Sequence, residues 1–334
     1  MSNPAIAVED LHKTYGSGSR AVVALEAVNL AVAAGEIYGL LGCNGAGKTT
    51  LVKILLDIVR PTRGRTTVLG VSTRSAAARR PVGYLPEDHR FPDYRSGAGL
   101  LDYYAALSGV NAQTRRKRIP ELLKLTGLAD AAQRKVRTYS KGMKQRLGVA
   151  QALVHEPRVL FLDEPTDGVD PVGRAHIRDI LRQLKGQGMT IFLNSHLLSE
   201  VERLCDRVGI LEKGKLVREG TLEALTRGAI LFALTTVPPL DEALRQALLE
   251  IAVSARQVAG GCEVELRSDA DLDRVIDLLR ARGVSIRSVA SKRLSLEDVF
   301  LQAVDKGAGG PAVHHEAHED HEKGTTPPSP SSSS

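Results

Sequence analysis

Short apolar runs alternate with helical patterns along the first 226 residues or so of the chain. Apolar side chains at helical spacing occupy residues 171–185 and 197–204. The runs with the length and composition of buried strands are residues 82–85, 159–162, 190–193 and 207–211. Strands and helices that alternate in this way are typical of a parallel sheet with crossover helices. The pattern therefore predicts an α/β domain with a mostly parallel sheet over residues 1–226.

Two stretches break this alternation. Residues 21–32 (AVVALEAVNLAV) partly alternate between apolar and polar positions, which favours an antiparallel β layer. Residues 91–150 are helical in pattern almost throughout. We interpret them as an α-helical subdomain inserted into the α/β domain.

The pattern of residues 227–305 predicts a second, smaller α+β domain. Its expected elements are a strand at residues 230–235, a helix at 241–252, strands at 254–258 and 263–266, a helix at 269–282 and a strand at 285–289. This order, βαββαβ, is the ferredoxin-like pattern. An amphipathic helix at residues 295–304 (SLEDVFLQAV) is expected to close the unit.

Residues 306–334 consist largely of Gly, His, Glu, Pro and Ser. Such a segment cannot bury enough apolar surface to offset the entropy lost on ordering, so we expect a disordered tail. Its histidines are His314, His315, His318 and His321. A solvated tail is the preferred interpretation, and weak binding of Zn²⁺ or Ni²⁺ is the alternative.

The composition is that of an ordinary globular protein, with 43% hydrophobic and 25% charged residues in 334. Three scattered cysteines show neither a disulfide framework nor zinc spacing, which suits a reducing cytosol. Residues 1–13 lack the features of a signal peptide, and no stretch approaches the roughly 20 apolar residues of a membrane helix. We therefore expect no direct membrane span, and a membrane role only through a partner.

The positive charge is concentrated in one region. Residues 111–147 contain eleven Lys or Arg and two acidic residues, a local charge of +9 against +6 for the whole chain. Such a surface could face anionic lipid or nucleic acid. Aromatic side chains that stack on bases are sparse there. A solvated helical face is therefore the preferred interpretation.

Residues 42–50 (GCNGAGKTT) fit the pattern G-x-x-x-x-G-K-[ST] between an expected strand at 36–41 and an expected helix at 50–59. A glycine loop in this position directs backbone N–H groups and the positive end of a helix into one concavity, where phosphate binds. Lys48 would reach the β- and γ-phosphates, and the Thr49 hydroxyl would hold Mg²⁺. The other loop residues expected at the nucleotide are Gly42, Asn44, Gly45, Ala46, Gly47 and Thr50.

Two carboxylates follow the apolar run VLFL at residues 159–162. Ligands of open α/β sheets bind at the carboxyl ends of the strands. Asp163 would hold Mg²⁺, directly or through water, and Glu164 would act as general base toward the attacking water. The alternative is a strand that ends in a polar turn.

A third motif, YSKGMKQR, begins the segment of residues 139–165 (YSKGMKQRLGVAQALVHEPRVLFLDEP), which ends with the two carboxylates. Here the chain resembles the ATP-binding cassette (ABC) ATPases, over about residues 5–220. YSKGMKQR occupies the position of the family's signature, so the resemblance implies that Ser140 and Gly142 contact phosphate. PTDGVDP at residues 165–171 matches the D-loop, with Asp170 as its aspartate. An N-cap role for Ser140 is the ordinary alternative.

The resemblance implies further nucleotide contacts. SHLLSEVERLCDRVGIL places His196 as the switch histidine at the γ-phosphate, and LHKTYG places Tyr15 where an aromatic ring stacks on adenine. Glu87, in VGYLPEDHRFP, stands where the family usually has a glutamine near the Mg²⁺ shell. His196 would join Lys48 and Glu164 in catalysis.

The sequence departs from the common pattern of the family at several positions. Cys43 stands where proline is frequent, and Tyr139, Lys141 and Met143 replace Leu, Gly and Gln of the signature. Ser140 and Gly142 are retained, so we expect the chain to be active.

GYLPE, YSKGM and LSLEDVFL (residues 294–301) resemble one branch of the family, prokaryotic exporters with separate ATPase and permease chains. The resemblance implies an ATPase subunit that uses ATP and Mg²⁺ and works as a homodimer or with a similar ATPase chain. It would sit in the cytoplasm on the inner face of the membrane, through a multi-helix permease. Residues 88–104 are the candidate permease contact, and no nucleic acid is expected.

Two alternatives remain. A soluble ABC ATPase acting on nucleic acid or ribosomes would suit the basic region, but members that act on ribosomes generally carry two cassettes in one chain. A plain P-loop kinase would leave the signature, the D-loop and His196 unexplained.

Overall fold

The α/β domain is built around a central six-stranded sheet whose inner strands are buried. The computed structural model of the chain describes residues 3–226, 230–238, 240–258, 260–268, 270–292 and 295–308. The order of strands in the central sheet is β10-β9-β3-β8-β7-β6. These strands are β3 (Ile37–Leu41), β6 (Val82–Leu85), β7 (Val159–Asp163), β8 (Thr190–Asn194), β9 (Arg207–Glu212) and β10 (Lys215–Thr221).

The strands β9, β3, β8, β7 and β6 are mutually parallel, and β10 pairs antiparallel with β9. Every residue of β3, β7 and β8 is buried, as expected for a parallel sheet covered on both faces. The predicted mostly parallel sheet is thus confirmed. β10 was not predicted, because its exposure alternates along an edge strand.

A second sheet, of antiparallel strands, covers one face of the central sheet. Its order is β2-β1-β4-β5, which confirms the antiparallel layer predicted around residues 21–32. Leu51 and Ile54 of α1 pack in one core with both sheets. The elements of this layer are β1 (Ile6–Tyr15), β2 (Val22–Val32), α1 (Lys48–Leu55), β4 (Arg63–Val68), β5 (Val71–Ser72) and α2 (Ala76–Arg79).

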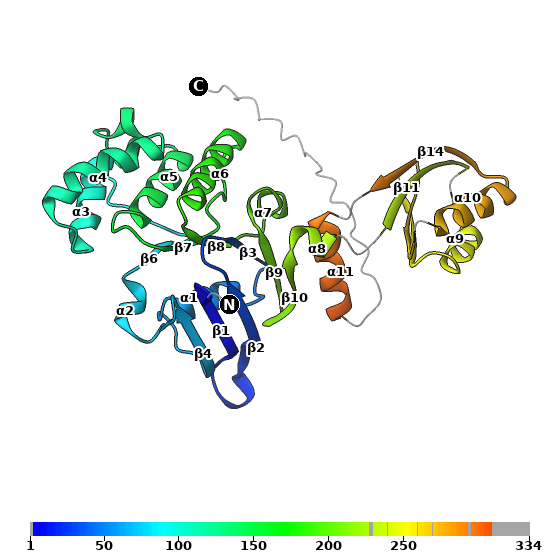
Figure 1. The fold of residues 1–334 in the computed structure, drawn as a ribbon, viewed down its shortest axis with the longest axis horizontal. Helices are drawn as coiled ribbons and strands as arrows, with labels where there is room; N and C mark the ends of the chain where they lie inside the picture. The colour runs from blue at the N-terminus through cyan, green and yellow to red at the C-terminus, as the bar shows by residue number, and fades with distance from the viewer. Residues whose placement is uncertain are drawn as a thin grey trace, which may run out of the picture.

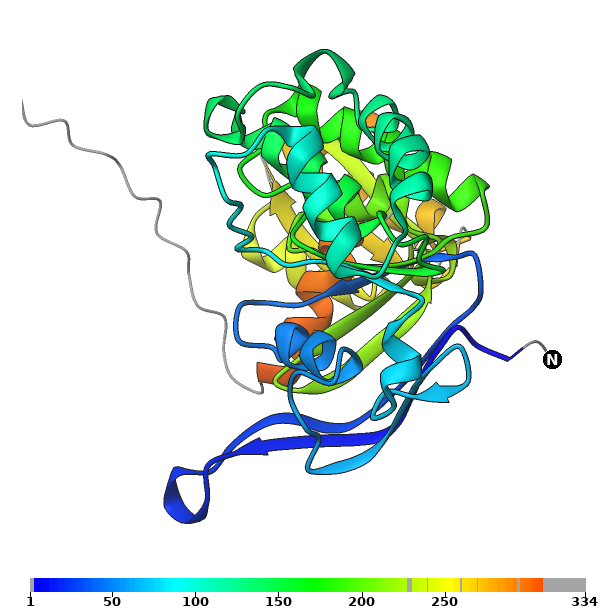
Figure 2. The same ribbon diagram turned by 90° about the vertical axis from the view of Figure 1, so that its left-hand side faces the viewer.

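Helices cover the opposite face of the central sheet (Figures 1 and 2). Those of the inserted subdomain lie at one end and share a core with the sheet. The helices on this side are α3 (Gly97–Leu107), α4 (Ala112–Leu125), α5 (Lys141–Ala152), α6 (Pro171–Gly186), α7 (Leu198–Leu204) and α8 (Leu222–Thr226).

The chain after α8 forms a separate antiparallel sheet of order β12-β13-β11-β14, which has its own core. Two helices, α9 and α10, bury Leu248 and Leu279 against it. The observed order confirms the predicted βαββαβ pattern. The elements are β11 (Ile230–Val237), α9 (Glu242–Leu249), β12 (Ser254–Val258), β13 (Gly261–Leu266), α10 (Asp271–Ala281) and β14 (Ser285–Lys292).

The last helix, α11 (Leu296–Ala308), differs from its prediction. Leu296, Val299 and Ala303 are buried in the core of the first part of the chain, not in that of the C-terminal sheet. α11 lies against α7, α8 and β9 (Figure 1). It therefore returns to the α/β domain instead of closing the smaller unit. The expected disordered tail with its histidines falls largely at residues 309–334, outside the described residues.

Candidate functional site

The loop between β3 and α1 adopts backbone conformations that require glycine. Gly45 (φ 81°) and Gly47 (φ 106°) lie in the left-handed region. A Cβ on Gly47 would lie 2.4 Å from the carbonyl oxygen of Ala24. α1 begins at the next residue, Lys48, so free N–H groups and the positive end of the helix dipole face this loop. The geometry is that of an anion site.

Lys48 is held within the loop. Its ammonium donates hydrogen bonds to the carbonyl oxygens of Gly42 (2.6 Å) and Cys43 (3.2 Å). The residue is only 7% exposed. Positive charge is thus fixed beside the backbone N–H groups of the loop, where phosphate charge would be neutralised.

A buried carboxylate ends strand β7. Asp163 is 2% exposed, and its Oδ1 accepts a hydrogen bond from the side-chain amide of Asn194 on β8. Burial raises the pKa of Asp163; the bond from Asn194 opposes this rise, and the charges of Glu87 and Glu164 add to it. A cation at this place would favour the charged form of Asp163.

Glu164 and His196 form a pair at the ends of β7 and β8. Glu164 Oε2 accepts from the backbone N–H of His196 (3.2 Å) and lies 2.9 Å from its ring Nδ1. The Glu164 side chain is 8% exposed and that of His196 47%. Glu164 also has a left-handed backbone (φ 49°), unusual for a residue with a side chain. A carboxylate is thereby held in fixed orientation beside the loop.

One cavity of about 560 Å³ collects these groups. Its lining is Val22, Val23, Ala24, residues 42–50, Glu87, Asp163, Glu164, Asn194, His196 and Phe300. The predicted residues of the phosphate loop, the two carboxylates, Glu87 and His196 are therefore brought together. Asn194 and Phe300 were not predicted.

Asn194 could have been found from the sequence, because it is the polar end of the apolar run at residues 190–193. It is 1% exposed. Its amide oxygen is buried without a protein hydrogen-bond partner. Such an orphan atom in a polar cavity fits a water or ion shell. Phe300 gave no comparable signal, since an aromatic residue on an amphipathic helix usually belongs to a core.

The oxygen donors of the cavity suit Mg²⁺. Among the described residues, no group of three or more His, Cys, Asp or Glu is arranged to hold a metal ion. Mg²⁺ usually takes one or two protein oxygens and completes its shell with phosphate and water. The Thr49 hydroxyl and the Asp163 carboxylate, both in the lining, are donors of this kind.

Tyr15 lies beside the cavity but not in its lining. It is 40% exposed, and Lys13 Nζ lies 4.6 Å from its ring centroid. Val22, its partner in the β1–β2 register, does line the cavity.

Ser140, Gly142 and Asp170 also lie outside the cavity lining. Ser140 caps α5, because its side chain accepts from Met143 N (3.2 Å). Asp170 caps α6 through Gly173 N (2.7 Å). Both residues are exposed, so they remain accessible to a second molecule while capping their own helices.

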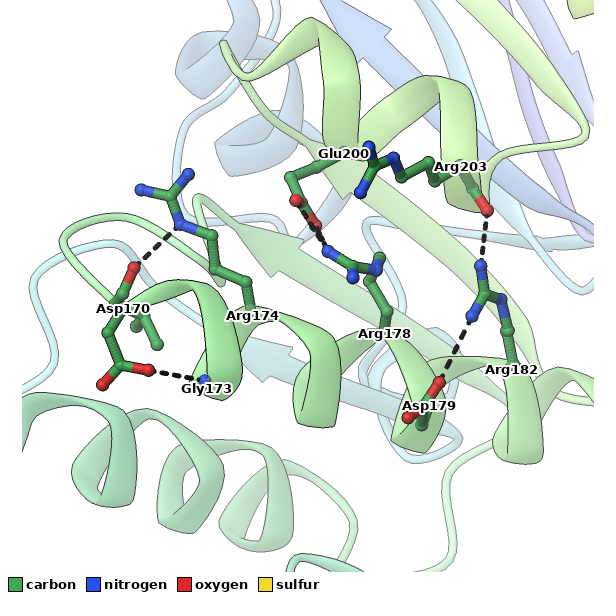
Figure 3. A network of polar contacts seen from close by, with 9 residues as sticks. Asp170, Gly173, Arg174, Arg178, Asp179, Arg182, Glu200 and Arg203 are labelled. Carbon is green, nitrogen blue, oxygen red and sulfur yellow. Dashed lines mark hydrogen bonds and ion pairs between the residues drawn. The ribbon is translucent and has the colours of Figure 1, made fainter.

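An ion pair and a hydrogen bond hold α6 against α7 (Figure 3). Both carboxylate oxygens of Glu200 on α7 lie 2.8 Å from Arg178 Nη1 of α6. Arg182 Nη2 donates to the carbonyl oxygen of Arg203 (3.0 Å). Glu200 is 7% exposed, so this pair is shielded from solvent. It anchors the helix that follows the His196 loop.

Comparisons with known proteins agree with this geometry. The family model described as ABC transporter matches residues 25–167, and that of the DrrA1-3-like C-terminal domain matches residues 231–304. An uncharacterized ABC transporter ATP-binding protein of Nostoc sp. is 40% identical over 306 residues, covering 90% of each chain. The chain belongs to the ABC transporter ATP-binding proteins. The resemblance found in the sequence is confirmed, and the chain is an ABC ATPase.

Other ABC ATP-binding proteins extend the comparison. The daunorubicin resistance ATP-binding protein DrrA3 of Streptomyces coeruleorubidus is 37% identical over 90% of this chain and 96% of its own length. The Nod factor export ATP-binding protein I of Bradyrhizobium diazoefficiens is 41% identical over 67% of this chain and 73% of its own. A solved cassette dimer in a post-hydrolysis state, bound to ADP and phosphate, superposes with a TM-score of 0.59 and 25% identity, over 65% of this chain and 98% of that one. None of the helices among the described residues of this ABC ATPase is long and apolar enough to cross a bilayer.

Cys43 of this ABC ATPase should react with a thiol reagent, and ATP should protect it. Cys43 is exposed in the cavity lining, whereas Cys205 and Cys262 are buried. Burial raises the pKa of Cys262 to about 11 and raises that of Cys205 further, which disfavours their reactive thiolates. The measurement is the rate of labelling with and without ATP, with Cys43→Ser as the unlabelled control. Equal rates in both conditions would contradict the placement of Cys43 beside bound nucleotide.

Proposed function

We propose that this ABC ATPase is the nucleotide-binding subunit of an exporter and dimerises on ATP to drive a separate membrane-spanning permease. The observation that carries the proposal is the separation of the phosphate-contacting residues. Lys48 and the phosphate loop line one cavity, whereas Ser140 and Gly142 lie outside it at the start of α5. A second chain would bring its own α5 to the cavity and complete the site. The export role is supported by the names of the two relatives, which refer to daunorubicin resistance and Nod factor export.

The residues of the cavity have distinct proposed roles in hydrolysis. Glu164 accepts a proton from the water that attacks the γ-phosphate. His196 orients the Glu164 carboxylate through its backbone N–H and ring and contacts the γ-phosphate. Lys48 and the loop N–H groups stabilise the negative charge of the β- and γ-phosphates. Each role uses an atom that the fold already holds in place.

Thr49, Asp163 and Glu87 would hold Mg²⁺, which when bound supplies positive charge to the phosphates. Glu87 lies near enough to Asp163 for its charge to raise the Asp163 pKa. Two neighbouring carboxylates favour a divalent cation more than a carboxylate and an amide would. Glutamate at this position therefore suits the role expected of the Q-loop residue.

The two copies would meet head to tail. Tyr15 stacks on the adenine beside Val22, and the phosphates lie between the loop of one chain and Ser140 and Gly142 of the other. The exposed N-terminus of α5 supplies N–H groups and a positive helix end to the partner's ATP. Asp170, at the adjoining D-loop, would face the same interface. ATP closes the dimer because both sides neutralise its phosphate charge.

We propose that the permease binds at residues 88–104. Tyr94 is 67% exposed and Tyr103 39%. The Arg95 guanidinium lies 4.7 Å from the Tyr103 ring centroid and 5.9 Å from that of Tyr94. Exposed tyrosines interleaved with arginine are typical of protein interaction sites. This surface directly follows Glu87, so movement of a permease there would be transmitted to the nucleotide.

A matched pair of variants tests the permease contact. Where a neighbouring gene encodes a multi-helix membrane protein, its co-expression with this chain should give a complex that co-purifies from the detergent-solubilised membrane fraction. Tyr94→Asp should reduce recovery of the complex at least about tenfold, as expected for a central aromatic contact. Ile58→Asp changes an apolar residue of similar exposure just after α1 (59%), outside both proposed interfaces, and should have no effect. Co-sedimentation of the chain with ribosomes or RNA instead of a membrane protein would overturn the exporter proposal in favour of a soluble ABC ATPase.

A further inference from the structure

Helix α11 places an aromatic side chain in the nucleotide cavity. Phe300 lines the cavity together with the phosphate loop, Glu164 and His196. It is half-buried and packs on the core of the α/β domain. In sequence, however, α11 follows the C-terminal sheet, and the matching C-terminal family model extends over residues 231–304. The C-terminal region thus contributes a wall of a site otherwise built by the α/β domain.

The position of α11 on the α/β domain is well defined at its start. Ser295 and Asp298 cap the helix reciprocally: Asp298 N donates to Ser295 Oγ (3.1 Å), and Ser295 N donates to Asp298 Oδ2 (3.0 Å). Leu296 N donates to Glu202 of α7 (2.5 Å). Leu296 and Val299 are fully buried. This end of the helix is fixed next to α7, which follows the His196 loop.

An ion pair connects α11 to the C-terminal sheet. Asp298 Oδ1 lies 3.3 Å from Arg256 Nη2 of β12. Arg256 also binds Glu263 of β13 at 2.6 Å. Hydrogen bonding to Glu263 is the largest cause of the raised pKa of Arg256, and the charge of Asp298 contributes. Arg256 thus connects the C-terminal sheet to Asp298 in the first turn of α11, the helix that carries Phe300.

We propose that the ring of Phe300 packs against the nucleotide bound in the same chain, so that the C-terminal region sets nucleotide affinity through α11. The inference rests on the proposed ATP site. The other lining residues are aliphatic, polar or charged, and Phe300 adds a phenyl face that a bound nucleoside triphosphate can contact. Movement of the C-terminal sheet, transmitted through Arg256 and Asp298, would withdraw or apply this contact.

The chain contains no tryptophan, so Phe300→Trp provides a single fluorescent reporter. The variant is made in a Ser140→Asp background, where the proposed pairing of two copies is blocked and any change arises within one chain. Titration with ATP and with ADP should change the tryptophan emission of Phe300→Trp. Leu301→Trp, on the adjacent and 49% exposed position of α11, should not respond. Unchanged emission of Phe300→Trp, at ATP concentrations where equilibrium dialysis shows binding, would overturn the proposal.

Affinity measurements give a second test. Phe300→Ala should raise the Kd for ATP about three- to tenfold, the usual range for losing one aromatic contact, while Leu301→Ala leaves it unchanged. Arg256→Gln should raise the Kd in the same direction but less, with Arg274→Gln as control for loss of an exposed ion pair within α10. Equal effects of Phe300→Ala and Leu301→Ala would contradict the contact. If Lys48→Ala binds ATP as the wild type does, the failure lies in the proposed ATP site itself.

Discussion

Glu164→Gln should reduce ATP turnover by about 10²–10⁴, the usual loss on removing a general base, while ATP binding persists. The amide keeps the size of the side chain and can still accept from His196 N, but it cannot take a proton from water. Lys48 and the phosphate loop, which we propose hold the nucleotide, are unchanged. The measurement is phosphate release at saturating ATP, together with equilibrium dialysis of ATP.

Glu121→Gln is the matched control for this variant. Glu121 is exposed on α4, away from the cavity lining. The same loss of charge there should leave turnover within about twofold of wild type, as is usual for surface positions without a specific role. Near-normal turnover of Glu164→Gln would contradict its assignment as general base.

Ser140→Asp should abolish ATP turnover and leave nucleotide binding to the single chain nearly intact. Aspartate caps helices as well as serine does, so the bond from Met143 N to the cap is preserved. The added carboxylate would, however, face the phosphates of the partner's ATP and repel them. Ser75→Asp makes the same change at the cap of α2, outside both the proposed dimer interface and the proposed permease contact, and should remain active.

Mixing the inactive Ser140→Asp and Lys48→Ala chains should restore part of the turnover. Each mixed dimer keeps one whole site, made of the intact phosphate loop of the first chain and the intact Ser140 of the second. Neither variant has such a site by itself. Absence of any rescue, with mixed dimers demonstrated by differential tagging, would argue that the site is not shared between chains.

Much of the fold could be predicted because its strongest signals are local. β7 and β8 are buried on both faces, so each reads as an unbroken apolar run ending in a polar residue, Asp163 or Asn194. The phosphate loop is dictated by glycines whose conformations no other residue adopts easily. Its helix begins earlier than the periodicity suggested, at Lys48, because the loop itself forms the first turn.

What could not be predicted depends on contacts between distant segments. The apolar face of α11 indicated burial, but periodicity does not specify which core receives a helix. Phe300 enters the nucleotide cavity only because Leu296 and Val299 pack on the α/β domain. β10 was missed because an edge strand buries little and carries charged residues.

The unusual signature residues also acquire a physical explanation from the structure. Tyr139 is buried, and its hydroxyl donates to the carbonyl oxygen of Ala131 (2.7 Å), so it belongs to the core of the helical subdomain. Lys141 Nζ lies 3.2 Å from Asp167 Oδ2. The ion pair joins the signature to the D-loop of the same chain, a connection that the family's usual glycine cannot make.

The backbone of Glu164 is locally strained. A non-glycine residue at φ 49° costs on the order of 1 kcal/mol relative to glycine. Glycine at this position would release the strain and also discard the carboxylate beside His196. Selection on folding alone would favour glycine there. The glutamate is therefore consistent with a trade-off, in which local stability is lost and the carboxylate proposed as general base is retained.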